Sequence, residues 1–334
     1  MTCFTPHLAP RFLWHYWSRI RHLGINWDLY VLCLCVLQKE KVTLAAASTL
    51  RKASVLITGA STGIGRDCAL FVDARGYRVF AGVRREADSE ALRKAASGNL
   101  VPLILDVTSP EQIAAAVETV RHEVGAQGLQ GLINNAGVAA VGPVEFLPLD
   151  EWRHQMEVNF LGVIAVTQAF LPLLRLSPQA RIINMSSFGG SVSSPFLGPY
   201  HASKFALEAM SDSLRMELAR TQIRVAVIKP AAVKTPIWQK AVKDKDRLLR
   251  DMPPEAETYY GYAIDAMVER AQDADKTGAS TDVVNRAVWH ALTSESPRTR
   301  YAVVVNGWIL AFLRLLPDRW RDRLTLGRLG LRES

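Results

Sequence analysis

The chain has 334 residues, of which 49% are hydrophobic, so it can bury a substantial core and is not expected to be disordered. Its formal net charge is +8, but acidic residues are interleaved with the basic ones except at the two ends, which favours a solvated surface over a nucleic-acid site. The four cysteines, three of them at or before Cys35, match neither a disulfide framework nor a metal-ligand spacing. We therefore expect a globular protein with no metal site and no nucleic-acid partner.

Residues 1–53 do not share the pattern of the rest of the chain. They are rich in Trp, Tyr, Arg and His and poor in acids, and their apolar run 29–37 is too short to span a bilayer. Three readings stay open for this N-terminal extension: an anchor on a membrane surface, an organelle-targeting segment, or residues translated upstream of the true start.

From residue 54 onward, short apolar runs rich in β-branched residues alternate with longer helical patterns. This alternation is typical of βαβ units, so we predict an α/β fold with a doubly wound sheet of about seven parallel strands in a single domain, 54–306. A long polar insertion, 236–279, is where a substrate lid would lie, and 307–334 is expected to form an amphipathic helical tail. The expected strands are 55–58, 78–83, 101–105, 131–134, 181–185, 223–229 and 300–305.

A glycine-rich turn follows the first expected strand and opens the first helix. Its sequence, TGASTGIG at 58–65, combines glycines that permit a tight turn with a helix N-terminus whose unpaired N–H groups attract a pyrophosphate. The placement between strand and helix distinguishes a dinucleotide site from an ordinary loop. The predicted contacts are Gly59, Ser61, Thr62, Gly63, Ile64 and Gly65.

The end of the second strand should discriminate between the two nicotinamide dinucleotides. A carboxylate there would bind the 2′-hydroxyl of NAD, but Arg84 and Arg85 follow the strand instead and are able to pair with a 2′-phosphate. We therefore favour NADP(H) over NAD(H), although both arginines would also suit a solvated strand end. After the third strand come Asp106 and Val107, which are expected at the adenine; Asp106 would equally suit a helix N-terminal cap.

A tyrosine and a lysine stand one helical turn apart at Tyr200 and Lys204, in a segment with helical periodicity, so both point from one face. A phenol with a pKa of about 10 is a poor base at pH 7, and a cation about 6 Å away would lower that pKa by about two. Ser187 follows a strongly apolar strand, at the end of the sheet where ligands bind, and its hydroxyl can hold a substrate oxygen beside the phenol.

The motifs Thr-Gly-x-x-x-Gly-x-Gly, Asn-Asn-Ala-Gly at 134–137, a helical Asn159, Ser187 and Tyr-x-x-x-Lys occur in the order and spacing of the short-chain dehydrogenases/reductases, which this chain closely resembles from about 53 to 235. The resemblance implies a Rossmann-like fold and an NAD(P)-dependent alcohol dehydrogenase or carbonyl reductase.

By this resemblance, four residues carry the chemistry. Tyr200 is the general acid/base, Lys204 lowers its pKa and binds the nicotinamide ribose, Ser187 orients the carbonyl, and Asn159 supports a water that relays protons to Lys204. Alanine stands at Ala231, where the family motif beside the nicotinamide has glycine, which puts the local backbone geometry in question. The remaining cofactor contacts implied are Asn135, Ala136, Gly137, Pro230, Val233 and Thr235.

The runs 142–145 and 199–207 resemble the retinol and 17β-hydroxysteroid dehydrogenase branch and its bacterial relatives, which implies a hydrophobic steroid, retinoid or lipid-like substrate. A 3-ketoacyl reductase and a non-catalytic dinucleotide-binding sensor are the alternatives. Candidate substrate-lining residues, which would equally suit ordinary packing, are Phe188, Val192, Phe196, Leu197, Ile237 and Trp238.

The family analogy also bears on assembly and location. Helices at 159–176 and 200–220 are the expected interface elements of a homodimer or homotetramer. We expect a cytoplasmic protein or, as the alternative, one that associates peripherally with a membrane through its N-terminal extension.

Overall fold

The computed structural model describes residues 53–237, 252–263, 266, 277–303, 307–329 and 331. All of these residues fall in one compact unit, Ala53–Ser334. The N-terminal extension up to residue 52, Trp238, residues 304–305 of the last expected strand and most of the expected lid lie outside the described residues.

Seven parallel strands form a single sheet in the order β3-β2-β1-β4-β5-β6-β7, which confirms the predicted doubly wound architecture. The strand order reverses between β1 and β4, so a crevice opens there at the carboxyl ends of the strands, where ligands bind in this architecture. The strands are β1 Ser54–Ile57, β2 Arg78–Val83, β3 Leu100–Ile104, β4 Gly131–Asn134, β5 Arg181–Met185, β6 Arg224–Pro230 and β7 Arg300–Val303.

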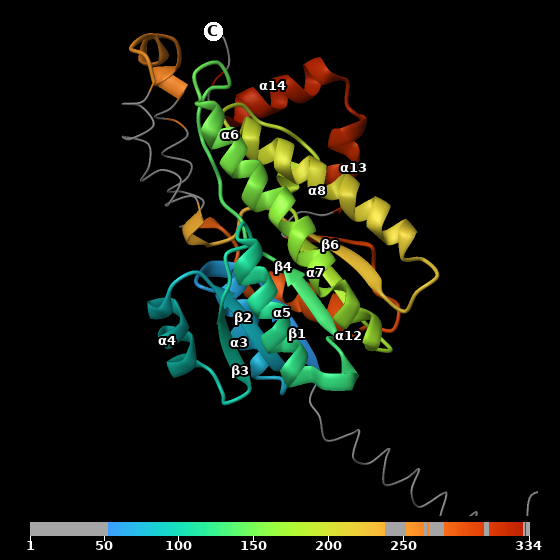
Figure 1. Cartoon of the computed structure of the whole chain (residues 1–334). Coiled ribbons are helices and arrows are strands. Elements are labelled where there is room, and N and C mark those ends of the chain that lie inside the picture. Colours follow the sequence, from blue (N-terminus) through green and yellow to red (C-terminus); the bar gives the residue numbers. More distant parts are fainter. Residues whose placement is uncertain are drawn as a thin grey trace, which may run out of the picture. The chain divides into compact units, whose positions relative to one another are not determined.

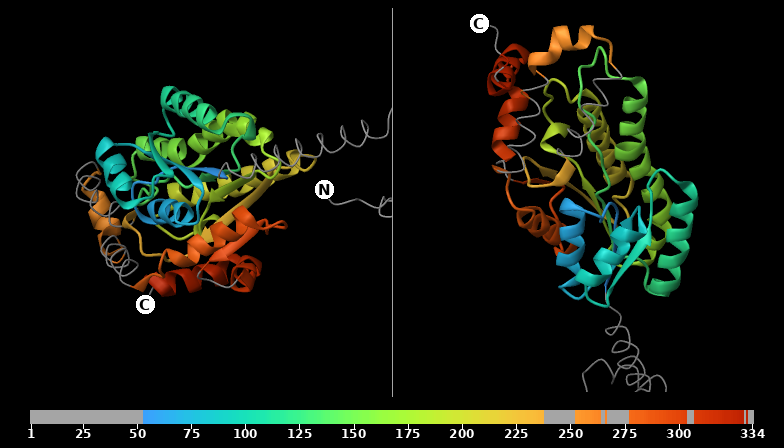
Figure 2. Two further views of the ribbon diagram at one scale, coloured as in Figure 1. Left: turned by 90° about the horizontal axis from the view of Figure 1, so that it is seen from below. Right: turned by 90° about the vertical axis from the view of Figure 1, so that its left-hand side faces the viewer.

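Helices cover both faces of this sheet (Figures 1 and 2). One face packs against α3 and α12, and the other against α5 and α7, which gives two hydrophobic cores separated by the sheet. The helices are α3 Gly63–Asp73, α4 Glu86–Ala95, α5 Pro110–Val124, α6 Leu149–Met156, α7 Gly162–Leu176, α8 Gly198–Glu217, α12 Asp282–Thr293, α13 Gly307–Leu315 and α14 Asp318–Leu329, with short turns of other helix types at η3 Gly125–Gln127, η4 Glu157–Leu161 and η5 Phe188–Gly190.

The strands are apolar throughout because both faces of the sheet are covered. In β1, Val55 and Ile57 belong to one core and Leu56 to the other, and all three side chains are fully buried. In β5, Ile183 and Ile182 divide in the same way. Such continuous runs of buried β-branched and aliphatic residues are what a parallel sheet requires.

The segment 149–176, which joins α6, η4 and α7, is long and apolar enough by length and composition to cross a membrane. Half of its most apolar window is buried inside the protein. Val166 and Phe170 of α7, for example, are fully buried in the core that includes α5.

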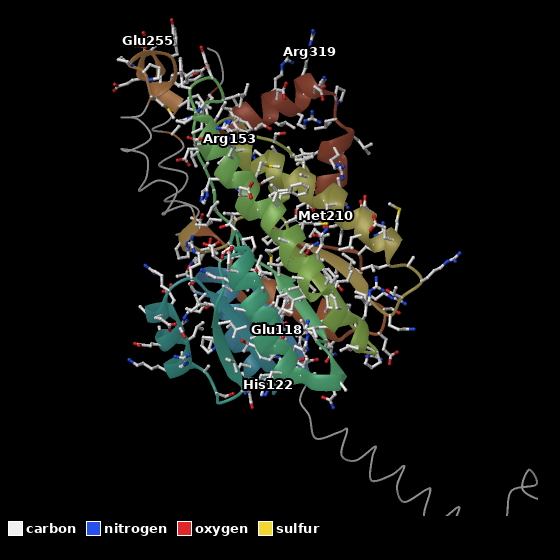
Figure 3. All side chains as sticks on the ribbon, viewed as in Figure 1. Glu118, His122, Arg153, Met210, Glu255 and Arg319 are labelled. Carbon is white, nitrogen blue, oxygen red and sulfur yellow. The ribbon has the colours of Figure 1, made fainter. Side chains whose placement is uncertain are left out.

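Helices α13 and α14 and the helical residues 255–263 lie beyond the carboxyl ends of the strands (Figure 1). Figure 3 shows polar side chains on the outer surfaces of the helices, among them Glu118 and His122 on α5 and Arg319 on α14, all three exposed. Apolar side chains are also exposed along one side of α13, where Trp308, Phe312 and Leu315 follow a helical spacing.

Candidate active site

A cavity of about 700 Å³ opens at the carboxyl ends of the strands. Residues that follow six of the strands line it together with the first turn of α3, so segments distant in sequence meet at one site. Of the predicted catalytic and cofactor-binding residues, Arg85 alone lies outside this lining. The predicted residues in the lining are Gly59, Ser61, Thr62, Gly63, Ile64, Gly65, Arg84, Asp106, Val107, Asn135, Ala136, Gly137, Asn159, Ser187, Tyr200, Lys204, Pro230, Val233 and Thr235.

The glycine-rich turn at the start of α3 has the backbone geometry of an anion cradle. Gly59 and Gly63 have φ angles of +66° and +58°, which other L-residues rarely adopt. A Cβ atom on Gly59 would lie 2.7 Å from Ala136 Cα, so the turn and the end of β4 are in close contact. The first turn of α3 holds no acidic residue, which leaves the positive end of its dipole facing the cavity. These features fit the pyrophosphate of a dinucleotide.

The Thr58 and Asn135 side chains fix this cradle to the neighbouring strand. The Thr58 hydroxyl accepts hydrogen bonds from the backbone N–H groups of Asn135 and Ala136, each at 3.0 Å. Asn135 Nδ2 in return donates to the carbonyl oxygens of Thr58 (3.0 Å) and Gly59 (3.1 Å). Asn135 therefore shapes the turn by holding its carbonyl groups. Thr58 begins the motif at 58–65 but was not among the predicted contacts, although its place directly before the glycine was the available signal.

Gly65 is the most crowded position of the turn. A Cβ atom there would lie 2.2 Å from Gly59 O and 2.3 Å from Asn135 Nδ2. We expect Gly65→Ala to weaken dinucleotide binding at least about tenfold and to destabilise the fold by about 1–3 kcal/mol, because the turn must shift away. Gly98→Ala is the matched control, since a Cβ atom at Gly98 meets nothing within 4 Å. Fluorescence titration with NADPH and thermal unfolding measure both effects; equal behaviour of the two variants would contradict this reading.

The two arginines after β2 point in different directions. Arg84 lines the cavity, whereas the Arg85 side chain is 75% exposed and donates from Nε and Nη2 to the two carboxylate oxygens of Asp88, at 3.0 and 3.1 Å. Arg85 also occupies the N-cap position of α4. The structure therefore brings Arg84, and not Arg85, to the site.

Asp106 lines the cavity next to Arg84 and is not a helix cap, because Ser109 caps α5. Its carboxylate accepts hydrogen bonds from Thr108 N at 2.9 Å and Thr108 Oγ1 at 2.7 Å. Partial burial alone would raise the pKa of Asp106, but the Thr108 hydrogen bonds and the positive charges of Arg84 and His154 outweigh it and lower the pKa. Asp106 is therefore an anionic hydrogen-bond acceptor at this end of the cavity.

At the other end, Tyr200 and Ser187 meet. The Ser187 hydroxyl accepts a hydrogen bond from Gly189 N at 3.0 Å and is also hydrogen-bonded to the Tyr200 side chain. Tyr200, near the start of α8, is only 7% exposed. Burial raises the pKa of Tyr200, and the Ser187 hydrogen bond opposes this only in part. The phenol is therefore protonated at neutral pH.

Lys204 lies one turn further along α8 and is 5% exposed. Its Nζ atom donates to Met185 O at 2.8 Å and lies 5.8 Å from the centroid of the Tyr200 ring. Burial lowers the pKa of Lys204 to about 8, with Glu208 acting in the opposite direction. The expectation that Lys204 lowers the pKa of Tyr200 stays a prediction, because burial of the phenol dominates the direction of the pKa here.

Asn159 lies in the π-helical turn η4, which explains how the helix tolerates it. Its Oδ1 accepts from Val138 N at 2.9 Å, and its Nδ2 donates to Val138 O at 3.0 Å and Ser203 Oγ at 3.2 Å. One turn earlier, the buried Gln155 binds Val138 O and Ala140 N, both at 2.8 Å. Both amides thus hold the segment after β4. Sequence analysis missed Gln155, whose buried position only the packing of α6 reveals.

The segment after β6 accommodates Ala231 without strain. Among the described residues other than glycine, Phe196 alone has a positive φ, so the alanine needs no left-handed backbone. Ala231 N donates to Val303 O at 3.1 Å, and Val233 forms a bridge to Ala279. These backbone contacts keep Val233 and Thr235 in the lining of the cavity.

The residues expected to line the substrate site lie mostly outside the lining of this cavity. Ile237 alone among the described ones lines the cavity. Phe196, with a φ of 64°, contacts the Tyr260 ring edge-on at 5.9 Å between centroids, and Tyr260 also donates a hydrogen bond to Glu145 at 2.9 Å. The remaining predicted lining residues, Phe188, Val192 and Leu197, are also outside the lining.

A family comparison agrees with this geometry. The sequence model of the family described as short chain dehydrogenase matches residues 53–246. The chain therefore belongs to the short-chain dehydrogenase/reductase family, and it is an NAD(P)-dependent oxidoreductase.

Curated relatives extend the match over most of the chain. An NADPH-dependent 3-dehydrocapnine reductase of Ornithobacterium rhinotracheale is 34% identical and covers 80% of this chain and 94% of its own length. The 17-beta-hydroxysteroid dehydrogenase type 6 of Bos taurus is 36% identical, with 90% and 95% covered, and human retinol dehydrogenase 5 is 38% identical, with 77% and 81% covered. Among solved structures, a short-chain dehydrogenase from Streptomyces avermitilis superposes with a TM-score of 0.66 at 26% identity and covers 84% of this chain and 97% of its own.

Proposed function

We propose that this protein interconverts an alcohol and its ketone or aldehyde on a hydrophobic substrate, with Tyr200 as the general acid/base. The observation that carries the proposal is that Tyr200, Ser187 and Lys204 meet in the same cavity as the glycine cradle. A bound nicotinamide would supply or accept a hydride at the substrate carbon. In the direction of reduction, the protonated Tyr200 donates its hydroxyl proton to the carbonyl oxygen, which the Ser187 hydroxyl holds in place.

Lys204 and Asn159 support this step without touching the carbonyl. We infer that the Lys204 ammonium, fixed by Met185 O, binds the ribose of the cofactor and stabilises negative charge on the phenolate. Asn159, which holds Val138, keeps the cavity wall open for a water that relays protons to Lys204. Asn135 maintains the glycine cradle, and Val233 and Thr235 flank the nicotinamide.

We infer a preference for NADP(H) over NAD(H), because Arg84 lines the cavity at the end of β2, where no carboxylate stands to bind a 2′-hydroxyl. The Ornithobacterium relative, named as NADPH-dependent, supports this preference. We expect Arg84→Ala to weaken NADPH binding about ten- to hundredfold, the value of one charge-assisted contact, with little change for NADH.

Arg85→Ala is the matched control for that substitution, since its guanidinium is exposed and bound to Asp88. It should change the dissociation constants of both cofactors by less than about threefold. A larger effect of Arg85→Ala than of Arg84→Ala on NADPH binding would reverse the assignment.

For the substrate we propose a steroid, retinoid or lipid-like carbonyl or alcohol. The names of the relatives, among them a hydroxysteroid and a retinol dehydrogenase, support this class. The deciding experiment follows nicotinamide absorbance with NADPH and NADH against steroid, retinoid and aliphatic carbonyls and a 3-ketoacyl thioester. Turnover of the apolar carbonyls supports the proposal, and selective turnover of the thioester favours a 3-ketoacyl reductase. Tight cofactor binding without any turnover would instead identify a dinucleotide-binding sensor.

We further propose a cytoplasmic homodimer or homotetramer, with peripheral membrane association as the alternative. The exposed Trp308, Phe312 and Leu315 on α13 support a surface that is covered by a second copy or by lipid. The proposed catalytic unit is 54–306, and it includes the lid at 236–279. The helical tail at 307–334 and the N-terminal extension at 1–53 lie outside this unit. Light scattering and detergent-dependent fractionation distinguish the two alternatives.

A further inference from the structure

Ser187 is carried by a short segment that connects β5 to α8 and contains the single turn η5, Phe188–Gly190. This segment has no strand or long helix of its own, so contacts with neighbouring elements must fix where the Ser187 hydroxyl lies. Directly after η5, Ser191 Oγ is hydrogen-bonded to Lys229 Nζ. Nearer to Ser187, the contact comes from α8 itself, through the imidazole of His201, the residue directly after Tyr200.

Both ring nitrogens of His201 bind this segment. Nδ1 lies 2.9 Å from Gly189 O, and Nε2 lies 2.9 Å from Ser194 Oγ. A carbonyl oxygen only accepts hydrogen bonds, so Nδ1 carries the proton, and in the neutral ring Nε2 accepts from the Ser194 hydroxyl. The side chain is buried, with His201 8% exposed. Burial lowers the pKa of His201 and only the Gly189 contact opposes it, which keeps the ring neutral near pH 7.

Gly189 is shaped around this ring. A Cβ atom at Gly189 would lie 2.5 Å from His201 Nδ1 and 2.8 Å from His201 Cε1, far inside contact distance. The same atom would lie 3.4 Å from Ser187 Oγ, so the imidazole and the Ser187 hydroxyl both adjoin the space that a side chain at Gly189 would occupy. Gly189 N also donates to Ser187 Oγ at 3.0 Å. The backbone of Gly189 therefore links the imidazole, through its carbonyl oxygen, to the Ser187 hydroxyl, through its N–H group.

We propose that His201 is a positioning residue: by binding Gly189 O and Ser194 it locks the segment that carries Ser187 and sets the distance between the Ser187 hydroxyl and the Tyr200 phenol. His201 touches neither substrate nor cofactor, because it is not among the residues that line the cavity. It acts through Gly189. Because Tyr200 and His201 are adjacent on α8, the same helix positions the phenol directly and the Ser187 hydroxyl through His201. This inference rests on the proposed reduction of a carbonyl at Tyr200.

The test compares His201→Ala, His201→Asn and His201→Gln in the full chain. The Asn amide is placed to replace Nδ1 as donor to Gly189 O, whereas the longer Gln amide replaces Nε2 toward Ser194. We expect His201→Ala to lower kcat about ten- to hundredfold, since a displacement of about 1 Å costs that much, with the dissociation constant of NADPH within about threefold of wild type. His201→Asn should recover most of the loss and His201→Gln should not.

A second readout does not depend on turnover. Hydrogen exchange of the peptide spanning 187–194 should accelerate in His201→Ala and stay near wild type in His201→Asn, because loss of the Gly189 contact loosens η5. His290→Ala is the control, since His290 Nδ1 binds Tyr301 Oη at 2.8 Å between α12 and β7. It should leave both kcat and the exchange of 187–194 unchanged.

A double-mutant cycle with Gly189→Ala completes the test. The added methyl group would displace the imidazole, so the losses in kcat of Gly189→Ala and His201→Ala should not add in the double variant. Additive losses, or a wild-type kcat for His201→Ala in an enzyme that turns over, would overturn the inference. Absence of turnover in the wild-type protein would instead count against the proposed function, while the exchange experiment would still decide whether His201 locks the segment.

Discussion

Tyr200→Phe is expected to lower kcat by about a thousandfold or more while leaving the fold and the cofactor site in place. The substitution removes the phenolic proton donor but keeps the buried ring, and general acid/base groups contribute about 10²–10⁴-fold to rate. Ser187 loses one hydrogen-bond partner but retains the bond from Gly189 N, so the expected loss of stability is about 1 kcal/mol. Steady-state kinetics with NADPH and the best carbonyl of the panel, together with thermal unfolding, measure both quantities.

Tyr301→Phe is the control for this substitution. Tyr301 lies in β7, and its hydroxyl accepts a hydrogen bond from Arg298 N at 3.0 Å and is hydrogen-bonded to His290 of α12. Both Tyr301 and His290 lie outside the lining of the cavity. The control therefore removes a hydrogen-bonded tyrosine hydroxyl without touching the site and should keep kcat within about twofold. The dissociation constant of NADPH in Tyr200→Phe should rise by no more than about fivefold, the value of one hydrogen bond. If Tyr200→Phe kept more than a tenth of the wild-type kcat, Tyr200 would not be the proton donor.

Lys204→Met is expected to raise the stability of the fold and to lower its activity. Burial lowers the pKa of Lys204 from 10.5 to about 8, a change worth about 3 kcal/mol against the folded state at neutral pH. Removal of the charge relieves this penalty, whereas loss of the hydrogen bond to Met185 O offsets about 1 kcal/mol of the gain. We therefore expect the free energy of unfolding to rise by about 1–3 kcal/mol while kcat falls about a hundredfold or more.

The difference in free energy of unfolding between Lys204→Met and the wild type should shrink as the pH rises above 8. Below pH 8 Lys204 is charged in both states, so the full penalty of burying the charge acts on the wild-type protein. Between pH 8 and 10.5 the folded state releases the proton and the unfolded state keeps it, so the wild type gains stability relative to Lys204→Met. Denaturant titrations at pH 7 and pH 9.5 should thus show a smaller gap at the higher pH.

Lys94→Met serves as the control, because Lys94 is exposed on α4. It should change the free energy of unfolding by less than about 0.5 kcal/mol at either pH. A Lys204→Met variant that is less stable than wild type at pH 7 would mean that the ion and hydrogen-bond partners of Lys204 outweigh the cost of its burial.

The amino-acid sequence by itself determined the sheet, the glycine cradle and the catalytic pair. The strands were predictable because side chains buried on both faces of a parallel sheet leave uninterrupted apolar runs, and all seven appear in the expected order along the chain. The turn at 58–65 and the pair Tyr200 and Lys204 depend on short-range geometry, namely a strand-to-helix turn and one helical turn. Such local relations are carried by residue type and spacing alone.

Only the tertiary structure decided what depends on packing between distant segments. Arg84 and Arg85 are neighbours with the same charge, but successive side chains at a strand end point to opposite sides, so one lines the cavity and the other pairs with Asp88. The aromatic Phe196 lies outside the lining of the cavity and packs edge-on against Tyr260, a residue 64 positions away in sequence. Burial by surrounding elements raises the pKa of Tyr200, and this burial could not be read from the spacing of Tyr200 and Lys204 on one helix.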